Sequence, residues 1–268
     1  MEGVTLENQF DMEDTNMKIA VVSDIHGNKQ ALEAVLADIA GYKPHHIVCL
    51  GDVVGYGGDP EWCVQTVKAV CSVCILGNHD VVVAEIQQLH GLNPMALYAL
   101  SWTMDNISED SLAFLRSLSY VAQGHGNKIG YVHSSFPHPQ GFGYLFRWER
   151  IQEHFEAQKH KIVFLGHSHV PDCWTTDGKK VFGTFGFRNN FVEFDLEGPH
   201  SDKSFINVGS VGQPRDGDSR ASYALVEKEG SRLLIHNKRV EYNIESAQKR
   251  IRECGLPENL ADRLERGK

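Results

Sequence analysis

The stretch KIAVVSDIHGN, residues 18–28, joins an apolar strand to a group of polar residues. Residues 18–23 form a β-branched apolar run, which predicts a buried strand. Apolar residues recur at helical spacing from Leu32 to Ile39, and Asn28 can cap the start of that helix. A strand that passes through a polar turn into a helix is typical of the first half of a β-α-β unit.

The same alternation continues along the chain. Residues 46–50 (HIVCL) and 72–76 (SVCIL) are predicted as the second and third strands, and Asp59-Pro60 opens a helix that ends near Val70. Strands that alternate with helices pair in parallel, with the helices crossing over the faces of the sheet. The front of the chain therefore predicts an α/β fold.

The remainder of the chain is helical at first and then rich in strands. Residues 81–117 have a helical pattern, with helix starts at Asn93-Pro94 and Ser108. Short strands separated by turn residues are expected at 119–123, 127–133, 161–165, 172–176, 179–185, 190–195, 204–208, 221–227 and 232–240. Further helices are expected at 148–158, 244–253 and 257–265. These patterns predict a single domain over residues 17–268, with helical or lid segments at about 81–118 and 136–160.

Composition and charge limit the partners of the chain. Apolar residues make up 41% of the 268 residues, and no apolar run approaches the roughly 18 residues that a membrane span requires. The formal charge is −9. Residues 1–16 hold acidic residues but no Lys or Arg, so we expect a disordered acidic tail there. A mildly acidic chain builds no broad nucleic-acid surface, so the positive charge for binding a phosphate must come from another source.

The cysteines point to a reducing compartment. They are scattered at positions 49, 63, 71, 74, 173 and 254, and no secretion signal precedes them, which favours a cytoplasmic location. Cys71 and Cys74 form a CxxC pair, but zinc needs two more ligands and none is close in sequence. We interpret this pair as buried or half-buried thiols.

Polar residues follow five of the predicted strands. In chain order they are Asp24, His26, Asp52, Asn78, His79, Asp80, His133, His167 and His169. Each motif alone has an ordinary explanation, such as a capping pair, a turn or a core histidine. Open α/β sheets, however, bind ligands at the carboxyl ends of their strands. Five strand ends that all carry such groups predict a metal site.

The spacing of these residues indicates how they share the site. In an extended chain, residues i and i+2 point the same way. Asp24 and His26 are therefore expected to bind one ion together, and His167 and His169 to face a shared site. Glycines at positions 27, 51, 77 and 166 permit sharp turns and close backbone approach.

The order of these motifs resembles the five signature blocks of the calcineurin-like metallophosphoesterases. The blocks are Asp24-x-His26, Gly51-Asp52, Gly77-Asn78-His79-Asp80, His133 and Gly166-His167-x-His169. Residues 207–215 (NVGSVGQPR) also resemble the last loop of the small bacterial and archaeal phosphodiesterases of this family, so the resemblance covers about residues 17–240. It implies two facing mixed β-sheets flanked by helices, a four-layer sandwich, with a dinuclear metal centre at the strand ends.

The resemblance also implies a role for each residue. The ligands would be Asp24, His26 and His169 for one ion, Asn78, His133 and His167 for the second, and Asp52 as the bridge. His79 would be the general acid, oriented by Asp80. This ligand set suits two divalent transition-metal ions per chain, of Mn, Fe, Zn, Ni or Co. Two such ions would supply the missing positive charge, and a hydroxide bridging them would be the nucleophile.

The chain departs from the protein serine/threonine phosphatases of this family. Those enzymes carry Asp-Arg-Gly in the second block and Glu after Asn-His in the third, whereas here Val53 follows Asp52 and Asp80 follows His79. The arginine that would grip a phosphomonoester is therefore missing. Arg215, together with Asn78, is the nearest candidate contact for the substrate, and the alternative for Arg215 is a surface side chain in a turn.

These observations predict a dinuclear metal-dependent phosphodiesterase that acts on a small or nucleotide-like phosphate ester. The alternatives are a diadenosine-polyphosphate or phosphomonoester hydrolase, a protein phosphatase, and an inactive scaffold of the same fold. The complete ligand set and the presence of His79 argue against a scaffold. The sequence leaves the oligomeric state open.

Overall fold

The structure, a computed structural model of the chain, describes residues 8–10, 16–88, 90–136, 138–144, 148–185, 191–199 and 201–268. Within those ranges, no helix has both the length and the apolar character that a membrane crossing needs. Residues 1–7 and 11–15 of the expected acidic tail lie outside the described residues. Asn8–Phe10 instead form strand β1 and pair in parallel with β5 (Val121–Gly124), so the expectation of a disordered tail is wrong there.

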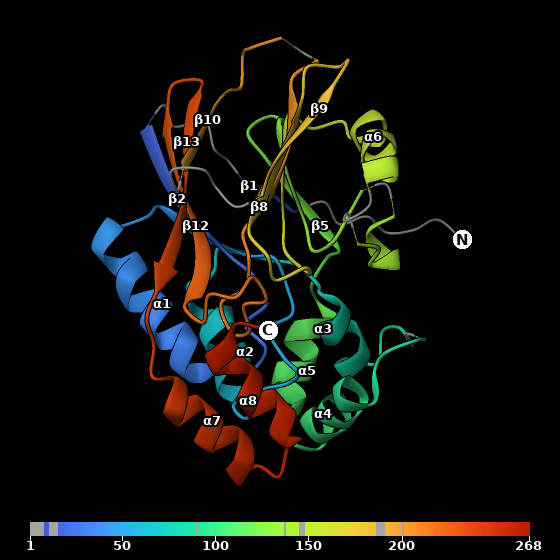
Figure 1. Cartoon of the computed structure of the whole chain (residues 1–268), viewed down its shortest axis with the longest axis vertical. Helices are drawn as coiled ribbons and strands as arrows, with labels where there is room; N and C mark the ends of the chain where they lie inside the picture. The colour runs from blue at the N-terminus through green and yellow to red at the C-terminus, as the bar shows by residue number, and fades with distance from the viewer. Residues whose placement is uncertain are drawn as a thin grey trace.

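Two mixed β-sheets face each other in the fold (Figure 1). In the described part of the chain, the larger sheet has seven strands in the order β1-β5-β6-β7-β11-β8-β9, and the smaller has six in the order β10-β13-β12-β2-β3-β4. The strands not yet given are β2 (Asn16–Val22), β3 (His46–Cys49), β4 (Val73–Cys74), β6 (Ile129–Val132), β7 (Ile162–Leu165), β8 (Asp172–Thr176), β9 (Val181–Phe185), β10 (Phe191–Asp195), β11 (Lys203–Asn207), β12 (Ala221–Glu229) and β13 (Arg232–Val240).

The six-stranded sheet contains the predicted β-α-β-α-β unit. Strands β2, β3 and β4 pair in parallel, and helices α1 (Lys29–Tyr42) and α2 (Pro60–Val70) connect them. Asn28 caps α1 by accepting a hydrogen bond from the Ala31 amide at 3.1 Å. The predicted α/β class is confirmed.

Apolar side chains alternate along the strands and build the layers. In β7, Ile162 and Phe164 belong to the core between the two sheets, whereas Val163 and Leu165 pack on the outer side with α6 (Trp148–Ala157). On the other side of the molecule, α1 and α2 pack against the six-stranded sheet. The layers are therefore helix, sheet, sheet and helix, which confirms the four-layer sandwich (Figure 1).

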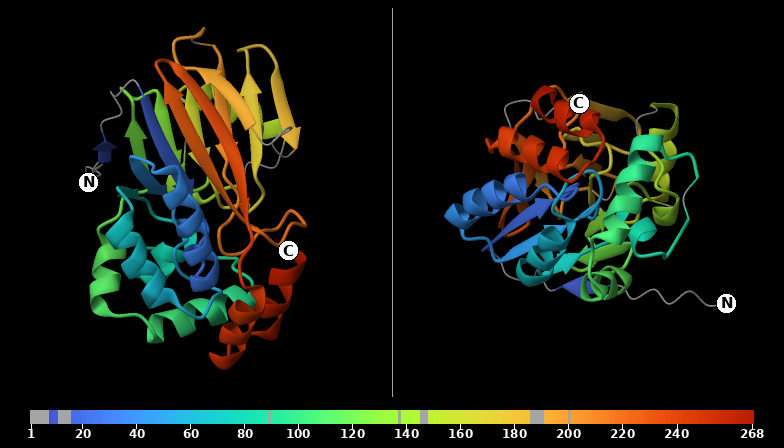
Figure 2. Two further views of the ribbon diagram at one scale, coloured as in Figure 1. Left: turned by 90° about the vertical axis from the view of Figure 1, so that its left-hand side faces the viewer. Right: turned by 90° about the horizontal axis from the view of Figure 1, so that it is seen from below.

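The remaining helices surround the end of the sheets at which β2, β3 and β7 finish (Figures 1 and 2). They are α3 (Asn78–Val83), α4 (Pro94–Asp105), α5 (Glu109–Arg116), α7 (Ile244–Glu253) and α8 (Glu258–Arg266). Helices α7 and α8 pack on each other through Ala247, Leu260 and Leu264, and Tyr56 joins the same apolar cluster. The end of the chain is thereby attached to the loop that follows β3.

The start of helix α3 differs from the sequence prediction in an informative way. Helix α3 begins at Asn78 rather than near residue 81, because the Asp80 carboxylate accepts a hydrogen bond from the Gly77 amide at 3.0 Å and caps the helix. The expected lid segment 136–160 contains a 3₁₀ turn, η1 (Pro139–Gly141), and α6; its residues 137 and 145–147 lie outside the described residues.

Candidate metal centre

The polar residues at the strand ends converge in one buried place. They follow β2, β3, β4, β6 and β7, and each is at most 7% exposed. The members are Asp24, His26, Asp52, Asn78, His79, Asp80, His133, His167 and His169. So many buried polar groups are costly unless they are hydrogen-bonded, paired or bound to a metal.

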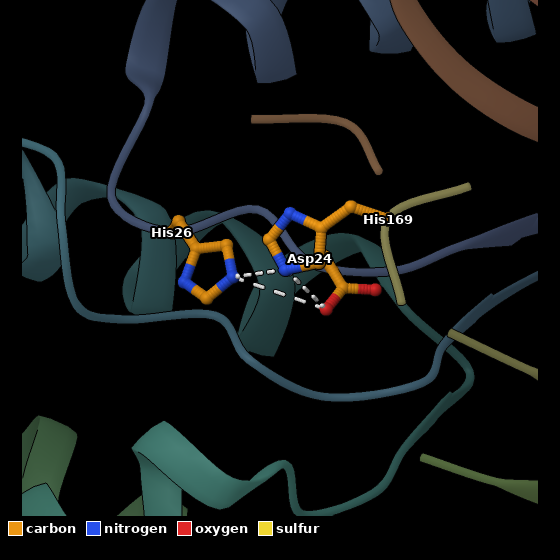
Figure 3. Close-up of side chains that lie close together, drawn as sticks. All are labelled: Asp24, His26 and His169. Atoms are coloured by element: carbon orange, nitrogen blue, oxygen red, sulfur yellow. Dashed lines mark hydrogen bonds and ion pairs between the residues drawn. The ribbon is translucent and has the colours of Figure 1, made fainter. Parts of the chain in front are cut away.

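One group of potential ligands consists of Asp24, His26 and His169 (Figure 3). The Nε2 atom of His169 lies 3.1 Å from Nε2 of His26 and 3.2 Å from Oδ1 of Asp24. The Nε2 atom of His26 lies 3.8 Å from the same Asp24 oxygen. Two imidazole nitrogens and a carboxylate oxygen thus face one point.

A second group of potential ligands lies directly beside the first. It contains Asp52, His133 and His167, whose potential ligand atoms lie within 4.8 Å of one another. The Nε2 atom of His133 is 3.4 Å from Oδ2 of Asp52 and 3.2 Å from Oδ1 of Asn78. Asn78 therefore brings its amide oxygen to this group. His167 and His169, one residue apart in sequence, belong to different groups.

Asp52 stands between the two groups. Its Oδ2 atom lies 3.6 Å from Nε2 of His26 and 3.4 Å from Nε2 of His133. Its Oδ1 atom accepts a hydrogen bond from the backbone amide of His79 at 2.8 Å. One oxygen is thus held by the protein, and the other faces both groups.

Backbone carbonyls fix the orientation of three of the imidazoles. The Nδ1 atoms of His26, His133 and His169 lie 3.1, 2.8 and 2.6 Å from the carbonyl oxygens of Val54, Leu50 and Gln213, respectively. A carbonyl oxygen only accepts, so Nδ1 carries the proton in each ring. Whenever a ring is neutral, its lone pair is then on Nε2, on the side that faces the two groups, which is how metal-binding histidines are usually arranged.

Several buried atoms in the centre have no hydrogen-bond partner among the described residues. They are Oδ1 of Asp24, Nε2 of His167 and Nδ1 of His79. Leaving such atoms unsatisfied costs about 1–3 kcal/mol each. For Asp24 and His167 these are the atoms that would bind an ion, so the residues fit a pair of metal ions.

The protonation states follow from burial and from the two carboxylates. Burial lowers the pKa of His167 to about 3, with the nearby His133 adding to the effect, and burial likewise lowers the pKa of His26 and His169. These rings are neutral at neutral pH, as metal ligands must be.

The pKa of His133 shifts in the opposite direction, and both carboxylates stay ionised. Burial favours a neutral His133, but the charge and hydrogen bond of Asp52, the charge of Asp24 and the carbonyl of Leu50 together outweigh it and raise the pKa of His133 to about 10. Burial also favours protonated Asp24 and Asp52, yet the histidines keep both pKa values far below the ordinary range. The centre thus attracts positive charge, either as a proton on His133 or as a metal ion, and binding of the ion would displace that proton.

Comparison with known proteins agrees with this geometry. The model of the calcineurin-like phosphoesterase superfamily domain matches residues 17–231. The chain belongs to this superfamily. It is 36% identical over 248 residues to an uncharacterized protein, MJ0912, from Methanocaldococcus jannaschii, covering 92% of this chain and 96% of that protein.

Solved structures show the same relationship. A metallophosphoesterase from Sphaerobacter thermophilus superimposes with a TM-score of 0.80 and 36% identity, over 94% of this chain and all of that chain. The hypothetical protein PH1004 from Pyrococcus horikoshii shares the fold with a TM-score of 0.71 at 19% identity, over 94% of this chain and 98% of that chain. The superfamily assignment indicates a phosphoester hydrolase, and superfamily members typically hold two metal ions.

The backbone of the phosphoesterase site corrects one prediction made from residue spacing. Asp24, His26, His167 and His169 are not extended but left-handed, with φ values of 53°, 51°, 65° and 61°. Strands β2 and β7 end just before these pairs, so the i and i+2 alternation of a strand does not apply to them. Such φ values are uncommon outside glycine and cluster at functional sites, where surrounding contacts hold the strain.

Gly166 shows how closely the loops of this phosphoesterase approach one another. A Cβ atom at this position would lie 2.0 Å from the Ser23 hydroxyl and 2.3 Å from Oδ2 of Asp24. The same carboxylate oxygen accepts a hydrogen bond from the amide of His167 at 3.0 Å. Only glycine therefore lets the loop after β7 reach Asp24.

Asp80 does not orient His79 in the way the resemblance implied. Its carboxylate accepts hydrogen bonds from the backbone amides of Asp52, Val53, Val54 and Gly77 at 2.8–3.3 Å. Burial, together with the negative charge of Asp52, raises the pKa of Asp80 to about 7, although the backbone donors act to lower it. The expected direct orientation is wrong, because the backbone donors bind the carboxylate. Asp80 instead fixes the loop that carries Asp52.

A cavity of about 340 Å³ opens onto the centre of the phosphoesterase. Its lining includes His79, Arg215 and Tyr144, and the Tyr144 ring stacks on His167 with centroids 4.1 Å apart. The lining also includes Tyr56 and Arg263, which the sequence motifs did not identify. No spacing rule could have placed Arg263 there, because its position depends on the packing of α8.

Proposed function

We propose that this phosphoesterase is a dinuclear metal-dependent phosphodiesterase acting on a small or nucleotide-like substrate. The observation that carries the proposal is the place of Asp52, whose Oδ2 faces His26 of one ligand group and His133 of the other at 3.6 and 3.4 Å. A carboxylate oxygen shared in this way is the expected bridge between two ions. Asp24, His26 and His169 would hold one ion, and Asn78, His133 and His167 the other.

Two bound divalent ions supply positive charge for the phosphate and acidify water for attack on phosphorus. The chain contributes the orientation of the ligands, through the carbonyls that hold three Nδ1 atoms. It also excludes bulk water, since the potential ligands are nearly fully buried. Manganese, iron, zinc, nickel and cobalt all suit this mixture of His, Asp and Asn ligands.

His79 is the proposed general acid. Its amide hydrogen-bonds to Asp52, and its ring lines the cavity with Nδ1 free of protein partners among the described residues. Burial lowers the pKa of His79 to about 4, so the imidazole is neutral before substrate binds. A phosphate anion in the cavity favours the charged form and raises this pKa. The ring takes up a proton from solvent as the substrate binds and then donates that proton to the departing oxygen, which leaves His79 neutral again, a role typically worth about 10²–10⁴-fold.

The residues after Asp52 support a phosphodiester rather than a phosphomonoester as the substrate. Val53 and Val54 are completely buried and apolar, so that this loop offers no cation for a doubly charged phosphate. The cavity volume of about 340 Å³ is at the small end of the range for ligand sites, which suits a small ester. The six cysteines, all of which the structure describes, form no disulfide, which supports a reducing location such as the cytoplasm.

Metal depletion followed by reconstitution tests the proposal. The protein is dialysed against a chelator, reloaded with each of the five metals, and assayed with bis(4-nitrophenyl) phosphate and 4-nitrophenyl phosphate. We expect hydrolysis to require metal and to favour the diester, and His79→Ala to keep the metal content while losing about 10²-fold or more in kcat. A rate that the chelator leaves unchanged would falsify the mechanism.

A further inference from the structure

A second arginine, Arg263, reaches the cavity from a distant part of the chain. It lies on α8, near the end of the chain, whereas Arg215 lies in the loop after β11. Both line the cavity that opens onto the metal centre. The Cζ atoms of Arg215 and Arg263 lie 5.8 and 5.9 Å from the centroid of the Tyr56 ring.

Tyr56 connects the arginines to the proposed catalytic group. Its ring centroid lies 4.5 Å from that of His79 and 4.7 Å from that of His26. Both guanidinium groups and the His79 ring therefore lie within about 6 Å of the same aromatic ring. Groups at this separation can contact different parts of one bound molecule.

Neither arginine is neutralised by an Asp or Glu side chain in the part of the chain that the structure describes. Arg215 donates to Oε1 of Gln213 at 2.9 Å, and its buried Nε atom has no partner there. Arg263 donates from Nε to an oxygen of the terminal carboxylate of Lys268 at 2.6 Å, so its charge is partly compensated there. The acidic residues next to Arg215 are engaged elsewhere, since Asp216 pairs with Arg239 and Asp218 with Arg220.

The fold holds the two arginines in place. The amide of Gly217, two residues after Arg215, donates to the carbonyl of Gly267 at 2.9 Å, just beyond α8. A Cβ atom at Gly267 would lie 2.8 Å from the backbone of Asp218, so the two segments are in close contact. Tyr56 and Leu264 belong to the same apolar cluster. The arginines thus sit on connected backbone rather than on free surface chains.

Two cations on adjoining backbone can bind an anion here, because in the described part of the chain Arg215 has no carboxylate partner and Arg263 has only the terminal carboxylate of Lys268. Like charges in a partly buried place repel each other, and an anion that contacts both guanidinium groups removes this cost. The metal centre already accounts for one phosphate. We propose that Arg215 and Arg263 bind a second anionic group of the substrate, so that the preferred substrates carry a phosphate in addition to the one that reacts.

This inference rests on the proposed function only in taking the metal centre as the place of the reacting phosphate. A binding experiment separates the two proposals, because it needs no turnover. The probes are thymidine 5′-monophosphate, thymidine 5′-diphosphate and thymidine 3′,5′-bisphosphate, titrated calorimetrically into manganese-loaded protein. All titrations use the His79→Ala background, in which any hydrolysis of the probes is slowed about 10²-fold or more.

We expect at least one of the two-phosphate nucleotides to bind about tenfold or more tightly than the monophosphate, as for one added charge-assisted contact. Arg263→Gln should abolish this preference, and Arg263→Lys should keep part of it. The matched control is Arg266→Gln, which removes the same charge from an exposed position on the same helix and should leave the preference intact. Circular dichroism and thermal melts check that each variant folds.

Three results would overturn the inference. The first is equal affinity for one and two phosphates in the parent protein. The second is a preference that survives in Arg263→Gln. The third is an equal loss in Arg266→Gln, which would indicate a general charge effect. If the preference holds while diester hydrolysis is absent, the anion site stands and the proposed reaction fails.

Discussion

Gly55→Ala perturbs the proposed general acid without touching a proposed metal ligand. Gly55 has a φ of +87°, and a Cβ atom there would lie 2.2 Å from Nδ1, 3.1 Å from Cγ and 3.2 Å from Cε1 of His79. Ordinary van der Waals contact begins at 3.4 Å, so the imidazole must retreat by about 1 Å from the methyl group. The methyl group therefore acts directly on the ring.

The size of the effect follows from this displacement. A misplacement of about 1 Å in a catalytic group costs about 10²-fold, and general acid catalysis as a whole contributes about 10²–10⁴-fold. We expect kcat for bis(4-nitrophenyl) phosphate to fall about 10²-fold, close to the effect of His79→Ala. The left-handed backbone adds a loss of about 1–2 kcal/mol in the free energy of unfolding.

The assay measures kcat, metal content and thermal stability in the same preparations. Gly230→Ala is the control, because Gly230 also has a positive φ, +60°, while its Cβ atom would meet nothing within 4 Å. It should lose stability but keep kcat. Full activity in Gly55→Ala would refute the role of His79, and loss of metal in Gly55→Ala would show that the effect does not act through His79 alone.

The remaining predictions concern the two buried carboxylates. Asp80→Ala should lower the free energy of unfolding by at least about 3 kcal/mol in urea titrations, because four backbone amides lose their acceptor. Asp177→Ala removes an exposed carboxylate that also accepts from two amides and should cost less than about 1 kcal/mol; equal losses would contradict the assigned role of Asp80. Asp52→Asn should retain fewer than two ions per chain by elemental analysis after dialysis, and an unchanged metal content would exclude Asp52 as the bridge.

The layers and most elements were predictable because they depend on local patterns. Alternating apolar residues mark β2 and β7, and the polar residues Asn28, Asn93 and Ser108 cap helices at the expected places. Strand β1 was not predictable, because Asn8–Phe10 has no apolar alternation of its own. Its pairing with β5 is a contact between distant parts of the chain.

Part of the candidate site was also predictable from the sequence, and part of it was not. The polar residues at the strand ends could be found in the sequence, because parallel strands deliver their carboxyl ends to one edge. The left-handed backbone at Asp24 and His169 could not be found in the sequence, because contacts between loops impose it. Arg263 could not be found either, because it reaches the cavity only after α8 packs against Tyr56 and the loop of Arg215.

Anomalous X-ray scattering from manganese-loaded crystals tests the central claim most directly. We expect two metal peaks per chain, with His169 bound to one, His167 to the other, and Asp52 between them. A single peak that both histidines share would contradict the assignment of the whole centre.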